Sequence, residues 1–245
     1  MSLIDSVGLS GLIFMALVLL GAYIIKGMAG FGSGLLAVPL LALVAPLTVI
    51  VPVLGLISYS GTLIQAYQLR EHVVWRDCWL VLPFSIMGVL VALWLFKQVD
   101  LYWLNKALAV FVMSYALYSL RPENTAVKNR YWAMPAGFLA GLVGALFGTG
   151  GPFYVTYLKL RQLNKSAFRA TIVFIFLFDG AIRISAYSAG GFYPADALIM
   201  AAMALPVLIL GLFIGHRIHL KITKQRFNQI ISVILLLSGL MLFLK

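Results

Sequence analysis

Long apolar stretches run through the whole chain, and only short polar loops separate them. The longest lie near residues 8–25, 48–68, 78–96, 101–120, 166–188, 195–218 and 227–244. One helical crossing of a bilayer needs about 20 apolar residues, so stretches of this length match membrane spans. Of the 245 residues, 63% are hydrophobic and 10% are charged, which is more apolar surface than one soluble core can bury. The sequence therefore predicts an all-α, multi-pass integral membrane protein.

Charge and cysteine content argue against several other classes. The net charge is +11, but Lys and Arg collect in loops that stay cytoplasmic, so we expect no nucleic acid as a partner. Cys78 is the single cysteine of the chain, which leaves it no intramolecular disulfide partner. His72, His216 and His219 lack the spacing of a metalloprotease site. We expect neither a metal nor a cofactor.

Two glycine clusters interrupt the apolar pattern, and each is followed by an apolar piece too short for a crossing, at 35–45 and at 152–160. The clusters are Gly27, Gly30, Gly32 and Gly34, and then Gly148, Gly150 and Gly151. The most polar stretch, 121–133, lies between the two parts and is predicted to be a cytoplasmic connector. It divides the chain into a first transmembrane repeat, 1–120, and a second, 134–245.

Matching details in the two halves indicate a duplication. Phe31-Gly32-Ser33-Gly34 aligns with Phe147-Gly148-Thr149-Gly150, and each follows an apolar run. Further along, Pro83 and Gly88 have the same spacing as Pro206 and Gly211. We therefore expect two homologous halves, each made of a glycine-broken pair (two short helices or a re-entrant hairpin) and three full spans.

The topology depends on whether each broken segment crosses the membrane once or turns back. A turn-back gives inverted repeats and places thirteen Lys and Arg on one side against three on the other. A single crossing gives parallel repeats and a ten-to-six division. The positive-inside rule favours the turn-back, with both termini outside the cytoplasm.

The glycine clusters predict an anion site. Non-helical backbone at membrane depth is tolerated where it is buried in protein or lines a cavity, and a helix that begins there presents free N–H groups and partial positive charge. Glycine lets a ligand approach these groups closely, and Ser33 and Thr149 add hydroxyls. The predicted contacts are Gly30, Gly32, Ser33, Gly34, Gly148, Thr149, Gly150 and Gly151, where the two broken segments meet. The alternative is close helix packing through small residues.

Ionisable and polar side chains inside the spans are further candidates. Asp179 and Arg183 are four residues apart on one helix face, which predicts an ion pair. Arg183 is also a candidate clamp for an oxyanion, and Asp179 either holds Arg183 or couples transport to a proton. Lys26, beside the first cluster, would add positive charge or would extend towards water instead. Ser60 and Gln65 are candidate cavity-lining donors, although Ser also bonds to its own helix backbone.

The two glycine motifs resemble the paired motifs of a known protein family. The segments Gly27-Met-Ala-Gly-Phe-Gly-Ser-Gly, followed by Pro39, and Gly144-Ala-Leu-Phe-Gly-Thr-Gly-Gly-Pro152 are similar to the paired glycine motifs of the TauE/SafE family of sulfite exporters. Many members have three consecutive glycines, which this chain lacks. The resemblance covers nearly the whole chain and implies a bacterial inner-membrane permease for sulfite, sulfonates or related small anions.

These observations together predict a secondary transporter for a small sulfur-containing anion, working by alternating access between repeats. A passive anion channel is the nearest alternative. An enzyme fits less well, because Asp179 is the one acid well inside a span. The expected partners are the anion, the bilayer and a coupling proton or ion, and a homo-oligomer remains open. No Walker-type loop occurs in the sequence.

Overall fold

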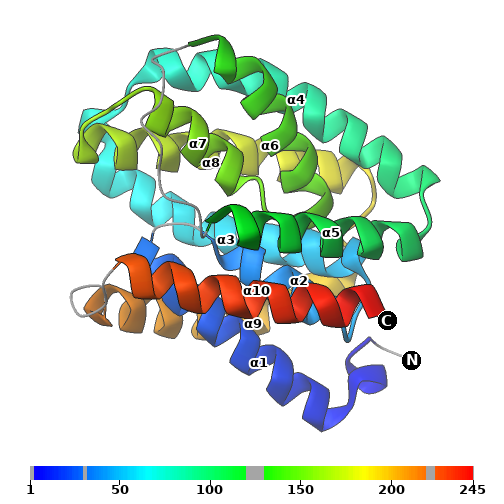
Figure 1. Ribbon diagram of the computed structural model, residues 1–245. Coiled ribbons are helices and arrows are strands. Elements are labelled where there is room, and N and C mark those ends of the chain that lie inside the picture. Colours follow the sequence, from blue (N-terminus) through cyan, green and yellow to red (C-terminus); the bar gives the residue numbers. More distant parts are fainter. Residues whose placement is uncertain (1–2, 30–31, 120–129, 219–223, 245) are drawn as a thin grey trace. The chain divides into compact units, whose positions relative to one another are not determined.

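The computed structural model describes residues 3–29, 32–119, 130–218 and 224–244, and this part of the chain is helical without any strand (Figure 1). It confirms the predicted all-α class. Two 3-10 turns, η1 (Arg70–His72) and η2 (Arg130–Trp132), accompany the α-helices. The α-helices are α1 (Leu3–Ala29), α2 (Ser33–Leu41), α3 (Leu47–Leu69), α4 (Trp75–Gln98), α5 (Leu101–Ser119), α6 (Ala133–Phe147), α7 (Gly151–Leu160), α8 (Lys165–Ala189), α9 (Ala195–Ile218) and α10 (Lys224–Leu244).

Every apolar stretch of the sequence forms one of these helices. Four of them, α1, α3, α4 and α9, contain segments long and apolar enough to cross a membrane. The first helix is longer than the predicted stretch 8–25 at both ends, since α1 begins at Leu3 and continues past Lys26 to Ala29, where Met28 and Ala29 are strong helix formers. Most of the predicted connector 121–133, namely residues 121–129, lies outside the described residues.

The helices form two compact units, each drawing on both halves of the sequence. Unit 1 contains residues 1–54, 99–123 and 193–245, and unit 2 contains residues 55–98 and 124–192. The division falls inside α3. Each unit is described by itself below.

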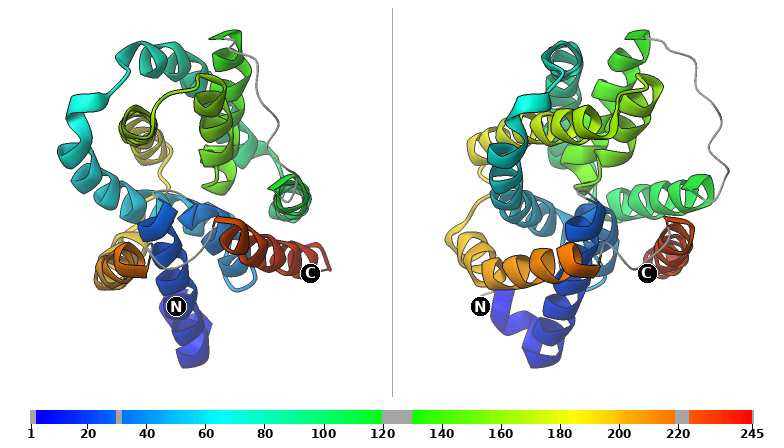
Figure 2. Two further views of the ribbon diagram at one scale, coloured as in Figure 1. Left: turned by 60° about the vertical axis from the view of Figure 1, so that its left-hand side comes forward. Right: turned by 90° about the vertical axis from the view of Figure 1, so that its left-hand side faces the viewer.

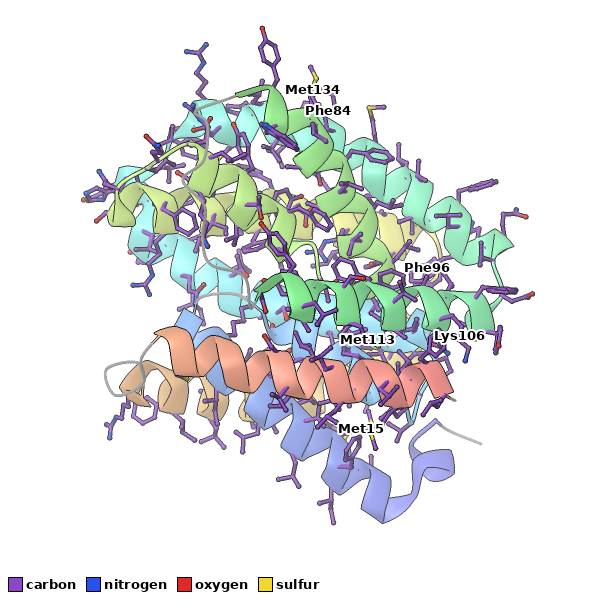
Figure 3. The ribbon with its side chains drawn as sticks, viewed as in Figure 1. Met15, Phe84, Phe96, Lys106, Met113 and Met134 are labelled. Atoms are coloured by element: carbon purple, nitrogen blue, oxygen red, sulfur yellow. The ribbon has the colours of Figure 1, made fainter. Side chains whose placement is uncertain are left out.

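In unit 1, α1 packs against α9, and α5 packs against α10 (Figure 2). Glycines bring the first pair together, since a Cβ atom on Gly215 would lie 2.2 Å from the carbonyl oxygen of Ile24. Such close backbone approach is typical of membrane helices. In the second pair, Met113 of α5 lies against α10 (Figure 3), where a Cβ on Gly239 would be 2.7 Å from its Cγ.

The ends of α5 and α10 are also joined by polar contacts. At one end, the Ser119 and Ser232 hydroxyls are 2.6 Å apart. At the other end, the Lys106 ammonium donates to the carbonyl of Phe243 and lies over the rings of Tyr102 and Phe243, 5.0 and 4.9 Å from their centroids. The two helices therefore run antiparallel.

In unit 2, α4 packs against α6 with similarly close backbones. A Cβ on Gly141 would lie 2.2 Å from the carbonyl oxygen of Ser85, and one on Gly137 would lie 2.6 Å from that of Val81. Phe84 of α4 and Met134 of α6 lie near each other on this pair (Figure 3). Because residues 81 and 85 face residues 137 and 141 in the same order, α4 and α6 run in the same direction.

The remaining helix of this unit, α8, packs against α4 and α7. Its first turn is capped by Asn164, whose side chain accepts a hydrogen bond from the Ala167 N–H at 2.8 Å. The ring of Phe174 meets that of Trp75 edge-on, with centroids 5.2 Å apart. The N-terminal parts of α4 and α8 are thus side by side.

Candidate functional site

The second glycine motif forms the turn between α6 and α7. Gly148 ends α6 with a φ of 65°, and its N–H donates to the carbonyl of Gly144 at 2.9 Å. This left-handed C-cap is the conformation that glycine adopts without strain. Gly151 then begins α7, a helix of 10 residues, about half the length that a bilayer crossing requires.

The N-terminus of α7 has no side-chain cap. Gly150 is its N-cap and supplies no side-chain hydrogen bond, so no capping side chain covers the first N–H groups. Thr149 is 3% exposed, and its hydroxyl oxygen has no hydrogen-bond partner among the described residues. A buried hydroxyl without a partner is uncommon. The start of α7 therefore holds a buried polar group whose hydrogen bonding is unsatisfied within the described residues.

Gly150 has a second role, in packing. A Cβ at this position would lie 2.3 Å from the carbonyl oxygen of Ala140 and 3.2 Å from the Cα of Gly144. The start of α7 therefore lies against the body of α6. For Gly150, the packing explanation considered from the sequence applies, because no side chain fits there.

Arg183 lies beside this turn. Its Nη1 donates to the carbonyl of Gly144 at 2.9 Å, and its Nε is 2.9 Å from Oδ2 of Asp179. The predicted i,i+4 ion pair is therefore present in α8. The guanidinium also complements the partial negative charge at the C-terminal end of α6, so two of its nitrogens are already engaged with protein oxygens.

Asp179 is held from three directions. Besides Arg183, its Oδ1 accepts from the Ser85 hydroxyl at 2.6 Å, and the Tyr154 hydroxyl lies 2.9 Å away. Tyr154 and Ser85 are 2.8 Å apart, and all three side chains are buried. A buried carboxylate needs this many partners. Sequence analysis missed Ser85 and Tyr154, which lie on α4 and α7 and carried no signal beyond a polar group in an apolar run.

A second buried acid lies at the other end of α7. Oδ1 of Asp77 accepts from the Tyr157 hydroxyl at 2.8 Å and from Nε of Arg161 at 3.0 Å. The side chains of Asp77 and Arg161 are 1% and 11% exposed. Sequence analysis predicted neither the burial of Asp77 and Arg161 nor their ion pair.

The first glycine motif belongs to unit 1. Gly32 has a φ of 95° and caps α2 without a side-chain hydrogen bond. Ser33, buried, and Gly34 begin that helix, while Gly30 lies outside the described residues. Lys26 is in the last turn of α1 and is 5% exposed, so its side chain does not extend into water.

The other two candidates are on α3, in unit 2. Ser60 is partly buried, and its hydroxyl donates to the carbonyl of Leu56 at 3.3 Å, one turn back in the same helix. Gln65 is also partly buried. In unit 2 the structure thus brings together the second glycine motif, Arg183 and Asp179, and Ser60 makes the local backbone bond that the sequence left as its alternative.

Comparison with known proteins gives the family. The model of the sulfite exporter TauE/SafE family matches residues 14–242. The chain belongs to the TauE/SafE family. It is 30% identical over 177 residues, 70% of this chain and 73% of the relative, to the probable inner membrane transporter protein TsaS of Comamonas testosteroni.

A second relative is the probable sulfite/organosulfonate exporter TauE of Cupriavidus necator, 22% identical over 195 residues, 77% of this chain and 76% of the relative. No solved structure matches the chain significantly. The chain is accordingly a multi-pass inner-membrane transporter of this family, and not an enzyme.

Proposed function

We propose that this transporter carries a small sulfur-containing anion, sulfite or an organosulfonate, and binds it at the N-terminus of α7. The observation that carries the proposal is the uncapped helix end with the buried, unpartnered Thr149 hydroxyl. The N–H groups and partial positive charge at such an end favour an oxyanion. The printed name of the Cupriavidus relative supports the substrate class.

In this proposal, Arg183 supplies positive charge beside the helix end, and Asp179 holds its guanidinium in place. Gly148, Thr149 and Gly151 contribute the close approach to the backbone. The uncapped N-terminus of α2, with Gly32, Ser33 and Gly34, has the same construction in unit 1 and is proposed to bind anion oxygens in the same way, with Lys26 as a nearby charge. Transport proceeds by alternating access.

The contacts within unit 2 support the turn-back topology. Asp77 precedes the long span α4, and Arg161 follows α7, yet they form an ion pair. A single crossing of the second broken segment, α6–α7, would leave these two loops on opposite sides of the membrane. The helix α6 runs along α4 in the same direction. The helix α7 runs back along α4, from Tyr154 near Ser85 to Arg161 near Asp77. The helices α6 and α7 together therefore have the arrangement of a re-entrant hairpin.

The contacts within unit 1 support the same topology independently. Lys106 lies in the second turn of α5 and Phe243 is near the end of α10, and they are in direct contact. If α6–α7 crossed the membrane once, these two residues would again lie on opposite sides. The packing partners are also reciprocal, since the first helix of each half pairs with the fourth of the other, α1 with α9 and α6 with α4. We therefore propose inverted repeats that exchange their fourth helices.

Anion binding to purified protein tests the proposed site. Sulfite, thiosulfate, taurine, sulfoacetate and acetate are compared by thermal shift, and we expect a sulfur oxyanion to raise the melting temperature. Thr149→Val removes the hydroxyl without changing the volume, and the affinity should fall about tenfold, as for one hydrogen bond to a charged group.

Thr156→Val is the matched control, because the Thr156 hydroxyl bonds to the carbonyl of Pro152 in the same helix at 2.8 Å. It should leave the affinity unchanged. Equal binding to wild type and Thr149→Val would contradict the proposed site. A bulky side chain at Gly150 is a poorer test, since it would collide with Ala140 and disturb folding as well as binding.

The rival function is a passive anion channel. Arg183, Asp179 and an uncapped helix end would serve as selectivity groups in either case. Uptake into proteoliposomes distinguishes the two, because a protonophore abolishes accumulation by a proton-coupled carrier and leaves the flux through a channel intact.

A further inference from the structure

The end of α7 opposite the glycine motif is tied to α4 by the buried acid described above. Asp77, in the first turn of α4, receives hydrogen bonds from Tyr157 and Arg161, which are the last two inward-facing polar side chains of the α7 segment. Tyr154 makes the corresponding contact nearer the glycine motif, with Ser85 of α4. The helix α7 is therefore hydrogen-bonded to α4 at two positions, Ser85 and Asp77. Of these two, only the contact with Asp77 includes an ion pair.

The Asp77 ion pair is incompletely satisfied. Arg161 uses Nε alone, and both donors converge on Oδ1. The other oxygen, Oδ2, is buried and has no hydrogen-bond partner in the described part of the chain. Arg–carboxylate pairs are strongest when two parallel bonds form, and a buried oxygen without a partner is costly. Oδ2 of Asp179 differs in that it lies 2.9 Å from Nε of Arg183, whereas the Arg161 guanidinium lies on Oδ1 of Asp77 alone.

The corner that carries Arg161 is strained. Gln162, the next residue, has a φ of 52°, and it is the one non-glycine residue with positive φ among those described. Such strain is concentrated at sites where the backbone changes conformation. The corner leads through the Asn164 cap directly into α8, which carries Asp179 and Arg183. Movement here would displace both the half-helix and the ion pair beside the proposed anion site.

The Asp77–Arg161 ion pair lies near one face of the membrane. Trp75 and Trp79, one turn apart on α4, are 45% and 62% exposed, and exposed Trp is enriched where helices leave the bilayer. The surrounding loops are rich in Lys and Arg, which makes this face the cytoplasmic one. An anion moving from the start of α7 towards the cytoplasm would therefore meet Arg161 next.

We propose that Asp77, Tyr157 and Arg161 form the latch of the cytoplasmic gate, closed in this structure and opened when Arg161 leaves Asp77. The inference rests on the proposed function, because a carrier needs such a gate. The anion itself assists opening, since its charge competes with Asp77 for the guanidinium. Tyr157 keeps its bond to Asp77 when Arg161 leaves, so that the acid retains one donor.

The chain contains its own reporter for this latch. Cys78 is fully buried next to Asp77, and its sulfur is 3.9 Å from the carbonyl oxygen of Thr171 on α8. It is the only cysteine in the sequence. Its alkylation by N-ethylmaleimide in inside-out vesicles therefore reports how often α4, α7 and α8 separate at this end, and Cys78→Ser gives the background.

Asp77→Asn is the informative variant. Asn keeps the volume and an acceptor for Tyr157 but removes the charge that holds Arg161, so Cys78 should react at least tenfold faster than in the wild type. In the double variant Asp77→Asn, Arg161→Gln, Cys78 should react no faster than in Asp77→Asn alone, because both substitutions remove the same ion pair. Arg169→Gln, which changes an exposed basic residue at the start of α8, should leave the rate unchanged.

Binding and unfolding are measured on the same variants. Faster labelling of Asp77→Asn with cooperative unfolding and anion-induced stabilisation both retained supports the latch. Labelling at the wild-type rate overturns it, and so does faster labelling accompanied by loss of cooperative unfolding, which would mean a purely structural role. If sulfur oxyanions fail to stabilise the wild type, the proposed function is contradicted, while the labelling comparison still decides the latch.

Discussion

At the scale of single residues, the most connected group in unit 2 is the Asp179 carboxylate. It joins α8 to α4 through Ser85 and to α7 through Tyr154, and it fixes the guanidinium of Arg183. Removing charge or donors here would leave a buried ionic group short of partners, which is among the costlier defects in a folded protein. Asp179 thus links the stability of the unit to the position of Arg183.

Tyr154→Phe tests this link with little change in volume. Tyr154 is fully buried, and the loss of its hydroxyl should reduce the free energy of unfolding by about 1–3 kcal/mol. Tyr118→Phe is the control, since Tyr118 is 57% exposed and its change should stay within about 0.5 kcal/mol. Denaturant unfolding of the detergent-solubilised protein measures both. Equal stabilities would show that the Tyr154 hydroxyl is not a significant partner of Asp179.

At the scale of elements, glycines set how closely helices approach in both units. Gly141 against Ser85 and Gly215 against Ile24 leave no space for a methyl group. The α4–α6 contact also places Ser85, so its carbonyl supports α6 while its hydroxyl reaches Asp179. Packing and polar contacts therefore depend on the same pair of helices.

Gly141→Ala should destabilise the protein by about 1–3 kcal/mol, the usual cost of overpacking, because the new Cβ would meet a backbone oxygen at 2.2 Å. Gly21→Ala gives the opposite expectation. Nothing lies within 4 Å of a Cβ at Gly21, so the higher helix propensity of Ala should stabilise α1 by up to about 1 kcal/mol. Thermal unfolding measures the melting temperature of both variants. A higher melting temperature for Gly141→Ala than for the wild type would contradict the described packing of α4 on α6.

Helices could be predicted from the sequence, but the pairing of side chains between them could not. Hydropathy and glycine breaks located all the helices, and the spacing of Asp179 and Arg183 within one helix predicted their ion pair. Ser85 and Asp179 are 94 positions apart, and Asp77 and Arg161 are 84 apart. Contacts at such separations depend on how helices pack, and membrane helices share too similar a composition for local pattern to specify their neighbours.

At the scale of the whole molecule, the two proposed repeats are unequal in chemistry. Both described Asp–Arg pairs lie in unit 2 around α7, whereas α2, the equivalent half-helix, is the apolar sequence Ser-Gly-Leu-Leu-Ala-Val-Pro-Leu-Leu without a charge. Each half-helix begins at an uncapped glycine turn. The proposed recognition of the anion by backbone thus uses both half-helices, whereas the two described Asp–Arg pairs surround α7 alone.

The orientation of the repeats gives the prediction that concerns the whole chain. Truncations fused to a fluorescent protein that matures only in the cytoplasm, made after His72 and after Gln162, should both fluoresce, because the Asp77–Arg161 contact requires the two loops to share one side. A fusion after Lys245 should be dark and one within residues 121–130 bright, as inverted repeats require. Fusion to alkaline phosphatase at the same points provides the complementary signal outside. If the fusions after His72 and Gln162 report opposite sides, the second broken segment crosses the membrane once. The inverted arrangement is then wrong, together with the cytoplasmic latch that depends on it.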